Sequence, residues 1–202
     1  MITAAVFDLG GVVLGSPLHV IRDYEREQGL APGVINRVVA GTGLAGAWSR
    51  HERGAIDFET FCAQFNDECR AAGALIDTRD VMGRIDRVTV PRPEMVVAVA
   101  TVRAAGFAVA ALTNNWAPLT DDELKAQFDI VVESSVVGVR KPQPQIYEIV
   151  LERLETEPEH VVFLDDIGAN LKPARALGMT TIKVTDPRQA LDELGEVLGL
   201  VL

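Results

Sequence analysis

The pattern of apolar and polar positions has a regular rhythm from residue 91 to the end of the chain. Short, continuous apolar runs alternate there with segments in which apolar residues recur every three or four positions. Continuous apolar runs are typical of strands buried on both faces, and the wider spacing is typical of amphipathic helices. Strands alternating with helices of this length predict an α/β fold with a doubly wound parallel sheet.

The predicted strands include one near the N-terminus, "TAAVFD", which carries the same apolar signature and belongs to the same sheet. Most of these helices have proline or acidic residues in their first turn, and two of them end on glycine, as helix termini commonly do. The pattern predicts strands at 3–8, 107–113, 129–134, 160–166 and 180–185, and helices at 91–106, 120–128, 143–155, 169–178 and 187–198.

Residues 15–90 contain no convincing strand pattern. Four stretches in this region have helical spacing, among them "HVIRDYEREQGL" and "DFETFCAQFNDECRAAG". We therefore predict a helical insertion that follows the first strand. In this division, residues 1–14 and 91–202 form the α/β core, and residues 15–90 form a helical cap.

Composition and charge limit the possible partners. The chain has 202 residues and a net charge of -10, which disfavours nucleic acids and anionic membranes as partners because both select basic surfaces. No uncharged stretch is long enough to span a membrane, and the N-terminus lacks the features of a signal peptide. Cys62 and Cys69 lie two turns apart on one predicted helix, where they cannot bridge each other. These features predict a soluble cytoplasmic protein with reduced thiols.

Polar residues stand where three of the predicted strands end. Asp8 ends the first strand, Thr113 ends the second and is followed by Asn114 and Asn115, and Asp165 and Asp166 end the fourth. Because ligands bind outside the carboxyl ends of parallel strands, these side chains are expected to share one pocket. Any one of them alone would be read more simply as a helix cap.

Lys141 joins this group from the loop after a further strand. Three carboxylates about 4 Å apart repel by roughly 4 kcal/mol per pair at an effective dielectric constant of 20. A hard divalent cation such as Mg²⁺ removes that repulsion and prefers oxygen ligands. The cation, Lys141, Thr113 and the main-chain N–H groups of Gly10 and Gly11 would together hold a phosphoryl group, which one carboxylate could attack.

Four segments resemble, in order, the motifs of the haloacid dehalogenase superfamily: "FDLGGVV", "ALTNN", "RKPQPQIY" and "VVFLDD" followed by an asparagine. The resemblance covers nearly the whole chain. It is strongest to the phosphatase-type members with a helical cap after the first strand, including sugar-phosphate phosphatases and the N-terminal phosphatase domain of soluble epoxide hydrolases. It implies a Rossmann-like core, Mg²⁺ as cofactor and hydrolysis of a small phosphorylated metabolite.

The resemblance also assigns the metal site. It implies that Asp8 is the nucleophile and a Mg²⁺ ligand, that the main-chain carbonyl of Gly10 and the carboxylate of Asp166 are further ligands, and that Asp165 and Asn170 support the metal or its waters.

For the phosphoryl group, the resemblance implies a hydrogen bond from Thr113 with Asn114 alongside, and charge neutralisation by Lys141. The glycines at 10 and 11 would let the main chain approach the phosphate closely. Trp116 directly follows the second motif and is expected at the edge of the pocket, where it could stack on substrate or pack against the cap.

Gly10 departs from the pattern of most phosphatases that the chain resembles, which carry a second aspartate there as general acid. Such a group contributes about 10²–10⁴-fold to the rate, or roughly 3–5 kcal/mol of barrier. A leaving group of low pKa, a water molecule or a cap residue such as His51 could replace it. For His51, the simpler interpretation is a solvated helix face.

Three alternatives to a phosphatase follow from this departure. A catalytically impaired protein that only binds phosphate would keep the metal site. A haloacid dehalogenase would keep Asp8 but would leave the pair Asp165 and Asp166 without a purpose. A phosphonate hydrolase would need a lysine in the cap, and residues 15–90 contain none. The apolar tail "VLGLVL" is compatible with packing on the core or with a homodimer contact, so the sequence leaves monomer and homodimer open.

Overall fold

The computed structural model describes all residues from Met1 to Leu202. Five parallel strands form one sheet in the order β3-β2-β1-β4-β5, which confirms the predicted doubly wound α/β fold. The strands are β1 (Ala4–Phe7), β2 (Ala108–Thr113), β3 (Ile130–Glu133), β4 (Val161–Asp165) and β5 (Thr180–Lys183).

The central position of β1 explains its uniformly apolar sequence. It pairs with β2 and β4, and all four of its residues are buried. Phe7 lies in register with Ala111 of β2 and Leu164 of β4. The residues that follow these three positions, Asp8, Leu112 and Asp165, therefore lie side by side near the carboxyl edge of the sheet.

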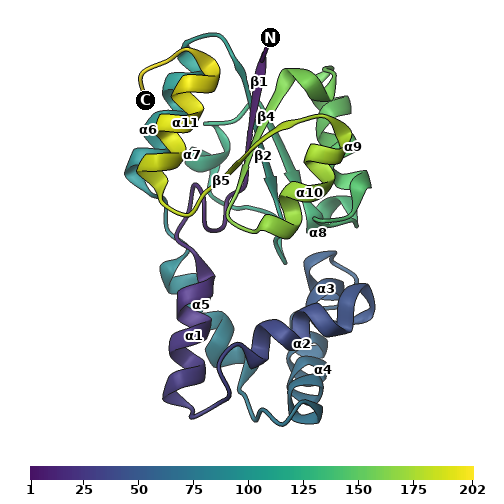
Figure 1. The fold of residues 1–202 in the computed structure, drawn as a ribbon. Coiled ribbons are helices and arrows are strands. Elements are labelled where there is room, and N and C mark those ends of the chain that lie inside the picture. The colour runs from purple at the N-terminus through teal and green to yellow at the C-terminus, as the bar shows by residue number, and fades with distance from the viewer.

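Helices cover both faces of the sheet (Figure 1). Each face has its own buried apolar cluster, one including Phe7 and Met95 and the other including Tyr147 and Phe163. On one side lie α6 (Pro93–Ala104), α7 (Asp122–Lys125) and α11 (Pro187–Leu198), and on the other lie α8 (Ser134–Val137), α9 (Pro144–Leu154) and α10 (Gly168–Leu177), with a 3₁₀ turn at Pro158–His160.

The cap segment, residues 15–90, is helical and lies below the carboxyl edge of the sheet in Figure 1. Its helices enclose a separate apolar cluster in which Trp48, Phe61 and Phe65 pack edge-on and stacked. The helices are α1 (Pro17–Glu27), α2 (Val34–Thr42), α3 (Ala47–Glu52), α4 (Phe58–Ala71) and α5 (Thr78–Val88), with a 3₁₀ turn at Gly43–Ala45.

The two linkers between core and cap lie side by side. The amide of Gly15 donates to the carbonyl of Val90 at 3.0 Å, and the amide of Arg92 donates to the carbonyl of Val13 at 2.9 Å. A Cβ atom at position 15 would lie 2.0 Å from the carbonyl oxygen of Val88, so only glycine allows this approach. Two adjacent segments of the chain, hydrogen-bonded to each other, therefore connect the cap to the core.

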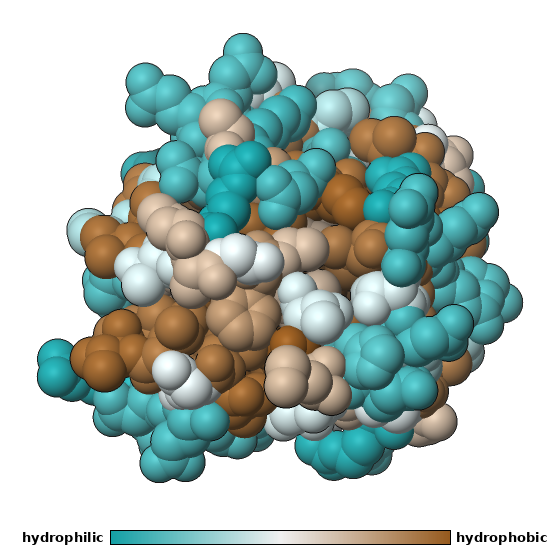
Figure 2. Space-filling view, turned by 90° about the horizontal axis from the view of Figure 1, so that it is seen from above, coloured by the Kyte–Doolittle hydropathy of each residue, from teal (hydrophilic) through white to brown (hydrophobic).

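Both chain ends lie at the end of the core away from the cap (Figure 1). Figure 2 views the molecule from this end and shows apolar side chains at the surface between polar ones. In the C-terminal tail, Leu200 and Leu202 pack against the core, whereas Val201 is 96% exposed. The tail thus packs on the core, one of the two predicted alternatives. No helix of the chain has the length and apolarity that crossing a membrane requires.

Two predicted elements differ from the structure. Helix α7 is a single turn, shorter than the predicted helix 120–128. The Asp121 side chain caps its N-terminus by accepting from the amide of Leu124 at 2.9 Å. The strand predicted at 129–134 ends at Glu133 because Ser134 starts the short helix α8, which the sequence pattern did not indicate.

Candidate active site

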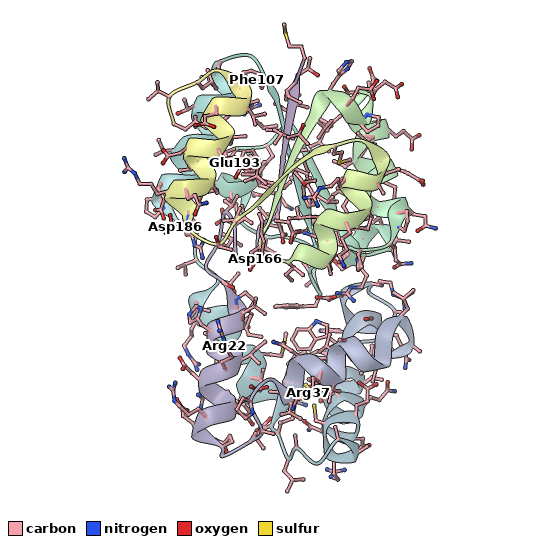
Figure 3. The ribbon with its side chains drawn as sticks, in the orientation of Figure 1. Arg22, Arg37, Phe107, Asp166, Asp186 and Glu193 are labelled. Carbon is pink, nitrogen blue, oxygen red and sulfur yellow. The ribbon has the colours of Figure 1, made fainter.

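Three carboxylates meet at the carboxyl edge of the sheet. Asp8 follows β1, Asp165 is the last residue of β4, and Asp166 comes next. One oxygen atom of each lies within 4.8 Å of the others. Asp8 and Asp165 are buried, and Figure 3 shows Asp166 at the edge of the core that faces the cap. The sheet register therefore brings together acids that lie far apart in the sequence.

Lys141 supplies the positive charge of this cluster. Its Nζ donates to Asp8 Oδ1, Asp165 Oδ2 and the carbonyl oxygen of Leu112, each at 2.8 Å. An ammonium group has three N–H donors, so all three are used. The side chain is completely buried, which is rare for lysine unless it is paired. Lys141 thus ties the nucleophile candidate Asp8 to the neighbouring strand.

The pKa directions reflect crowding of negative charge. Burial raises the pKa of Asp8 well above its usual value, and Lys141 offsets part of that rise. Burial and repulsion from Asp165 raise the pKa of Asp166 to about 6. Burial alone would lower the pKa of Lys141, but attraction to Asp165 and Asp8 raises it. Three carboxylates and one ammonium leave the cluster short of positive charge.

The surroundings of Asp166 fit a hard divalent cation. Its Oδ1 atom is buried without a hydrogen-bond partner, and its Oδ2 accepts only a long bond of 3.3 Å from Ser16 Oγ. Gly11 has a φ of +83°, and a Cβ there would lie 2.0 Å from Asp166 Oδ2. An orphaned carboxylate oxygen beside two further acids is a suitable oxygen donor set for Mg²⁺.

Two asparagines hold the cluster in place. Asn170 donates from Nδ2 to both carboxylate oxygens of Asp165 at 3.1 Å. Asn114 uses both polar atoms of its side chain on the main chain of Lys141, donating to its carbonyl at 3.0 Å and accepting from its amide at 2.9 Å. Asn114 therefore orients the lysine, a contact that the sequence motif did not reveal.

A cavity of about 520 Å³ lies between the sheet edge and the cap segment. Asp8, Gly10, Thr113, Trp116 and Lys141 line it, together with Asn114 and Asn170, whereas Gly11, Asp165 and Asp166 do not. Trp116 also packs against the apolar cluster of the cap, so both predicted contacts of this ring are possible at once. The cap contributes an apolar wall formed by Leu18, Ile21, Ile35, Val39, Trp48 and Ile85.

Gly10 leaves open space in this cavity. A Cβ atom built at position 10 would meet nothing within 4 Å, and its φ is not in the left-handed region. At Gly11, in contrast, the carboxylate of Asp166 leaves no room for a Cβ atom. A Cβ atom at position 10 is therefore tolerated sterically, so glycine is not needed there to avoid a clash.

A buried ion pair joins the cap to the core, and sequence reasoning missed it. Glu52 Oε2 lies 2.6 Å from Arg140 Nε, while Glu52 Oε1 accepts from Trp48 Nε1 at 2.9 Å. Arg140 also donates to Ser49 Oγ at 2.9 Å, and Ser134 Oγ donates to the carbonyl of Glu52 at 2.6 Å. The only sequence signal was the position of Arg140 directly before Lys141.

The family model for haloacid dehalogenase-like hydrolases matches residues 2–178. This chain belongs to that family. Acyl-CoA dehydrogenase family member 10 of Mus musculus is 36% identical over 98% of the chain and 19% of its own length. Bifunctional epoxide hydrolase 2 of Sus scrofa is also 36% identical, over 98% of the chain and 39% of its own length. The hydrolase thus spans less than half of either relative.

The chain aligns with other relatives over most of their own length. The sesquiterpene phosphatase astK of Aspergillus oryzae is 27% identical, over 97% of the chain and 96% of its length. A (S)-2-haloacid dehalogenase of Pseudomonas sp. is 23% identical, over 91% of the chain and 84% of its own length.

Among solved structures, a HAD-like hydrolase of Porphyromonas gingivalis gives a TM-score of 0.73 at 23% identity, covering 98% of both chains. A HAD enzyme of Bacteroides thetaiotaomicron in complex with magnesium and inorganic phosphate gives 0.61 at 21%, covering 91% and 94%. These structural likenesses establish the fold.

His51 does not line the cavity of this hydrolase. Its ring stacks on Phe61 with centroids 4.4 Å apart, and its Nδ1 lies 3.1 Å from the carbonyl oxygen of Ile56. Burial lowers the pKa of the ring. The prediction of a solvated helix face was wrong, because α3 turns His51 into the apolar cluster of the cap.

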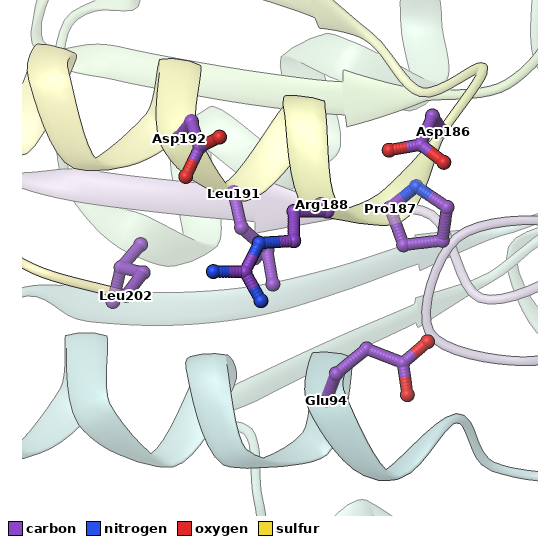
Figure 4. Close-up of a pocket in the computed structure, with 7 residues that line it drawn as sticks. All are labelled: Glu94, Asp186, Pro187, Arg188, Leu191, Asp192 and Leu202. Atoms are coloured by element: carbon purple, nitrogen blue, oxygen red, sulfur yellow. The ribbon is translucent and has the colours of Figure 1, made fainter.

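A second pocket of about 310 Å³ lies between α6 and α11 (Figure 4). Glu94, Asp186 and Asp192 give it an acidic rim, with Arg188 among them. The Asp186 carboxylate caps α11 by accepting from the amide of Gln189 at 2.9 Å. None of the residues lining this pocket belongs to the carboxylate cluster, so the pocket is separate from the candidate active site.

Proposed function

We propose that this hydrolase is a Mg²⁺-dependent phosphatase that acts on a small phosphorylated metabolite through an aspartyl-phosphate on Asp8. One observation carries the proposal. Asp8 lines the cavity, and its carboxylate forms an ion pair with Lys141. It also lies close to Asp165 and Asp166, and Asp166 has a buried oxygen without a hydrogen-bond partner. This is the arrangement expected of a nucleophile beside a cation site.

In this proposal, Asp8, Asp166 and the main-chain carbonyl of Gly10 hold the metal, and Asp165 and Asn170 support it. When bound, Mg²⁺ would supply positive charge that offsets the charge developing on the phosphoryl oxygens. The unpartnered Oδ1 of Asp166 and the raised pKa of its carboxyl support this role.

The proposed reaction has two displacements. A carboxylate oxygen of Asp8 attacks phosphorus in line, and the bond to the leaving oxygen breaks with its electron pair remaining on that oxygen. Lys141 holds the Asp8 carboxylate in place, and the Thr113 hydroxyl at the end of β2 donates to a phosphoryl oxygen. Water then attacks phosphorus, which releases inorganic phosphate and restores the Asp8 carboxylate.

The cavity walls support a substrate with an apolar body. The cap wall and Trp116 would bury such a body, at about 25 cal/mol for each Å² of apolar surface removed from water. The similarity to a sesquiterpene phosphatase points in the same direction. A cytoplasmic location, and a monomeric or homodimeric state, stay predictions from the sequence.

Hydrolysis of p-nitrophenyl phosphate by the purified protein tests the proposal, with Mg²⁺, with EDTA and with Asp8→Asn as the matched control. We expect turnover that needs Mg²⁺ and is lost in the variant. Absence of turnover with Mg²⁺ binding intact would favour the catalytically impaired phosphate-binding protein. Release of halide from a 2-haloacid, without a metal, would favour the dehalogenase.

A further inference from the structure

Resting on the proposed function, we propose that this enzyme selects its substrates by their leaving group. It cleaves phosphoryl groups from oxygens that depart as stable anions, as in acyl phosphates, phosphoanhydrides and activated aryl esters. It turns over simple alkyl phosphates poorly, because no side chain of the cavity is placed to give the departing oxygen a proton.

The first observation is the open space at Gly10. The residue lines the cavity two positions after Asp8, and nothing lies within 4 Å of its would-be Cβ. No neighbouring atom of the core or the cap would therefore contact a Cβ at this position.

The second observation concerns the other acids of the cavity. No histidine, cysteine or tyrosine lines it, and the carboxylates besides Asp8 are Glu52, Asp86 and Asp121. Asp86 and Asp121 are exposed, and Asp121 accepts from the amide of Leu124 as a helix cap. Both side chains therefore face solvent, and Asp121 is committed to its helix terminus.

Glu52 is occupied elsewhere. One of its oxygens accepts from Trp48 Nε1, and the other is paired with Arg140 Nε at 2.6 Å. Burial raises the pKa of this carboxyl, and Arg140 and Trp48 oppose that rise. With each oxygen directed at one of these neighbours, the side chain serves the contact between cap and core. Lys141 is likewise committed, since all three of its N–H groups point to Asp8, Asp165 and Leu112.

The consequence depends on the substrate. A general acid accelerates a reaction by about 10²–10⁴-fold, chiefly when the leaving group is a poor one. An alkoxide needs that proton, whereas a carboxylate, a phosphate or an activated phenolate leaves without it. The missing group therefore discriminates between substrates even where their bodies fit the cavity equally well.

A series of aryl phosphates with phenols of increasing pKa tests this inference. We expect kcat/KM of the wild type to fall steeply as the pKa of the phenol rises. The matched variant Gly10→Asp, which the open space accommodates, should flatten this dependence. It should raise kcat/KM for phenyl phosphate by about 10²-fold or more and change the 2,4-dinitrophenyl ester by less than about tenfold. Acetyl phosphate should be cleaved by the wild type and ethyl phosphate should not.

A shallow dependence in the wild type would overturn the inference, whether or not Gly10→Asp folds. A dependence that becomes steep only in Glu52→Gln would also overturn it, because Glu52 would then be the acid. These outcomes differ from failure of the proposed function, in which even the 2,4-dinitrophenyl ester is not hydrolysed with Mg²⁺, or is hydrolysed equally by Asp8→Asn.

Discussion

The core and the cap bury different kinds of side chain at the cavity that they share. At the core edge, Lys141 is buried among Asp8 and Asp165, so charge is concentrated where water is excluded. On the cap side, most of the wall is aliphatic and aromatic, with the carboxylates of Glu52 and Asp86 among the apolar side chains. In the proposed function, this difference separates two tasks: the core supplies the charges for chemistry, and the cap supplies a surface that a substrate body can contact.

One carboxylate from each region makes the contrast specific. In the cap, Glu25 accepts from the amides of Gly33 and Ile35 at 2.6 and 2.9 Å, so both oxygens are satisfied by the chain itself. In the core, Asp166 keeps one buried oxygen without a partner. The first carboxylate is structural, whereas the second has capacity for a ligand.

The largest expected effect comes from breaking the core ion cluster. Lys141→Met leaves Asp8 and Asp165 buried without their counter-charge, so we expect the free energy of unfolding to fall by about 3–5 kcal/mol. Urea unfolding followed by circular dichroism measures the change, with phosphatase activity lost in parallel. A loss under about 1 kcal/mol would contradict the view that Lys141 holds the site together.

Metal addition should stabilise the core site by a smaller amount. At 100 times its dissociation constant, a ligand that binds only the folded state adds about 2.7 kcal/mol. We expect Mg²⁺ to raise the melting temperature of the wild type and to have little effect on Asp166→Asn, which loses a charged oxygen of the site. Equal stabilisation of both proteins would place the metal elsewhere.

The two neighbouring glycines provide a matched pair of variants. Gly11→Ala places a methyl group 2.0 Å from Asp166 Oδ2 at a φ of +83°, so we expect a loss of stability of about 1–3 kcal/mol together with weaker Mg²⁺ binding. Gly10→Ala meets open space and should change stability by less than about 0.5 kcal/mol. Thermal unfolding of both variants in parallel checks the pair, and equal losses would refute the steric difference.

The smallest effects are expected from ion pairs of the cap. Glu52→Gln leaves Arg140 without its counter-charge at the junction with the core, and we expect about 1–3 kcal/mol of destabilisation with a higher KM. Arg79→Ala removes an exposed cap pair with Glu59 and should leave both stability and KM nearly unchanged. An equal change of KM in both variants would show that the ion pair of Glu52 and Arg140 does not affect substrate binding in the cavity.

The sequence predicted the parts of the molecule that depend on local pattern. Buried parallel strands read as apolar runs, and their carboxyl ends share one edge, so the meeting of Asp8, Asp165 and Lys141 could be predicted. The pair of Glu52 and Arg140 could not, because it depends on how the cap docks. His51 was misplaced because α3 has only six residues, too few for a clear apolar periodicity.

The pairing of Gly15 with Val90 bears on how the chain reaches its fold. The core strands β1 and β2 are separated in sequence by the whole cap segment, and closing a loop of about 75 flexible residues costs roughly 4 kcal/mol in chain entropy. Helices α1 and α5, which adjoin the two linkers, pack against each other. A cap that forms early would therefore hold the linkers together before the sheet assembles, and the central strand pair would then form as if it were a short-range contact.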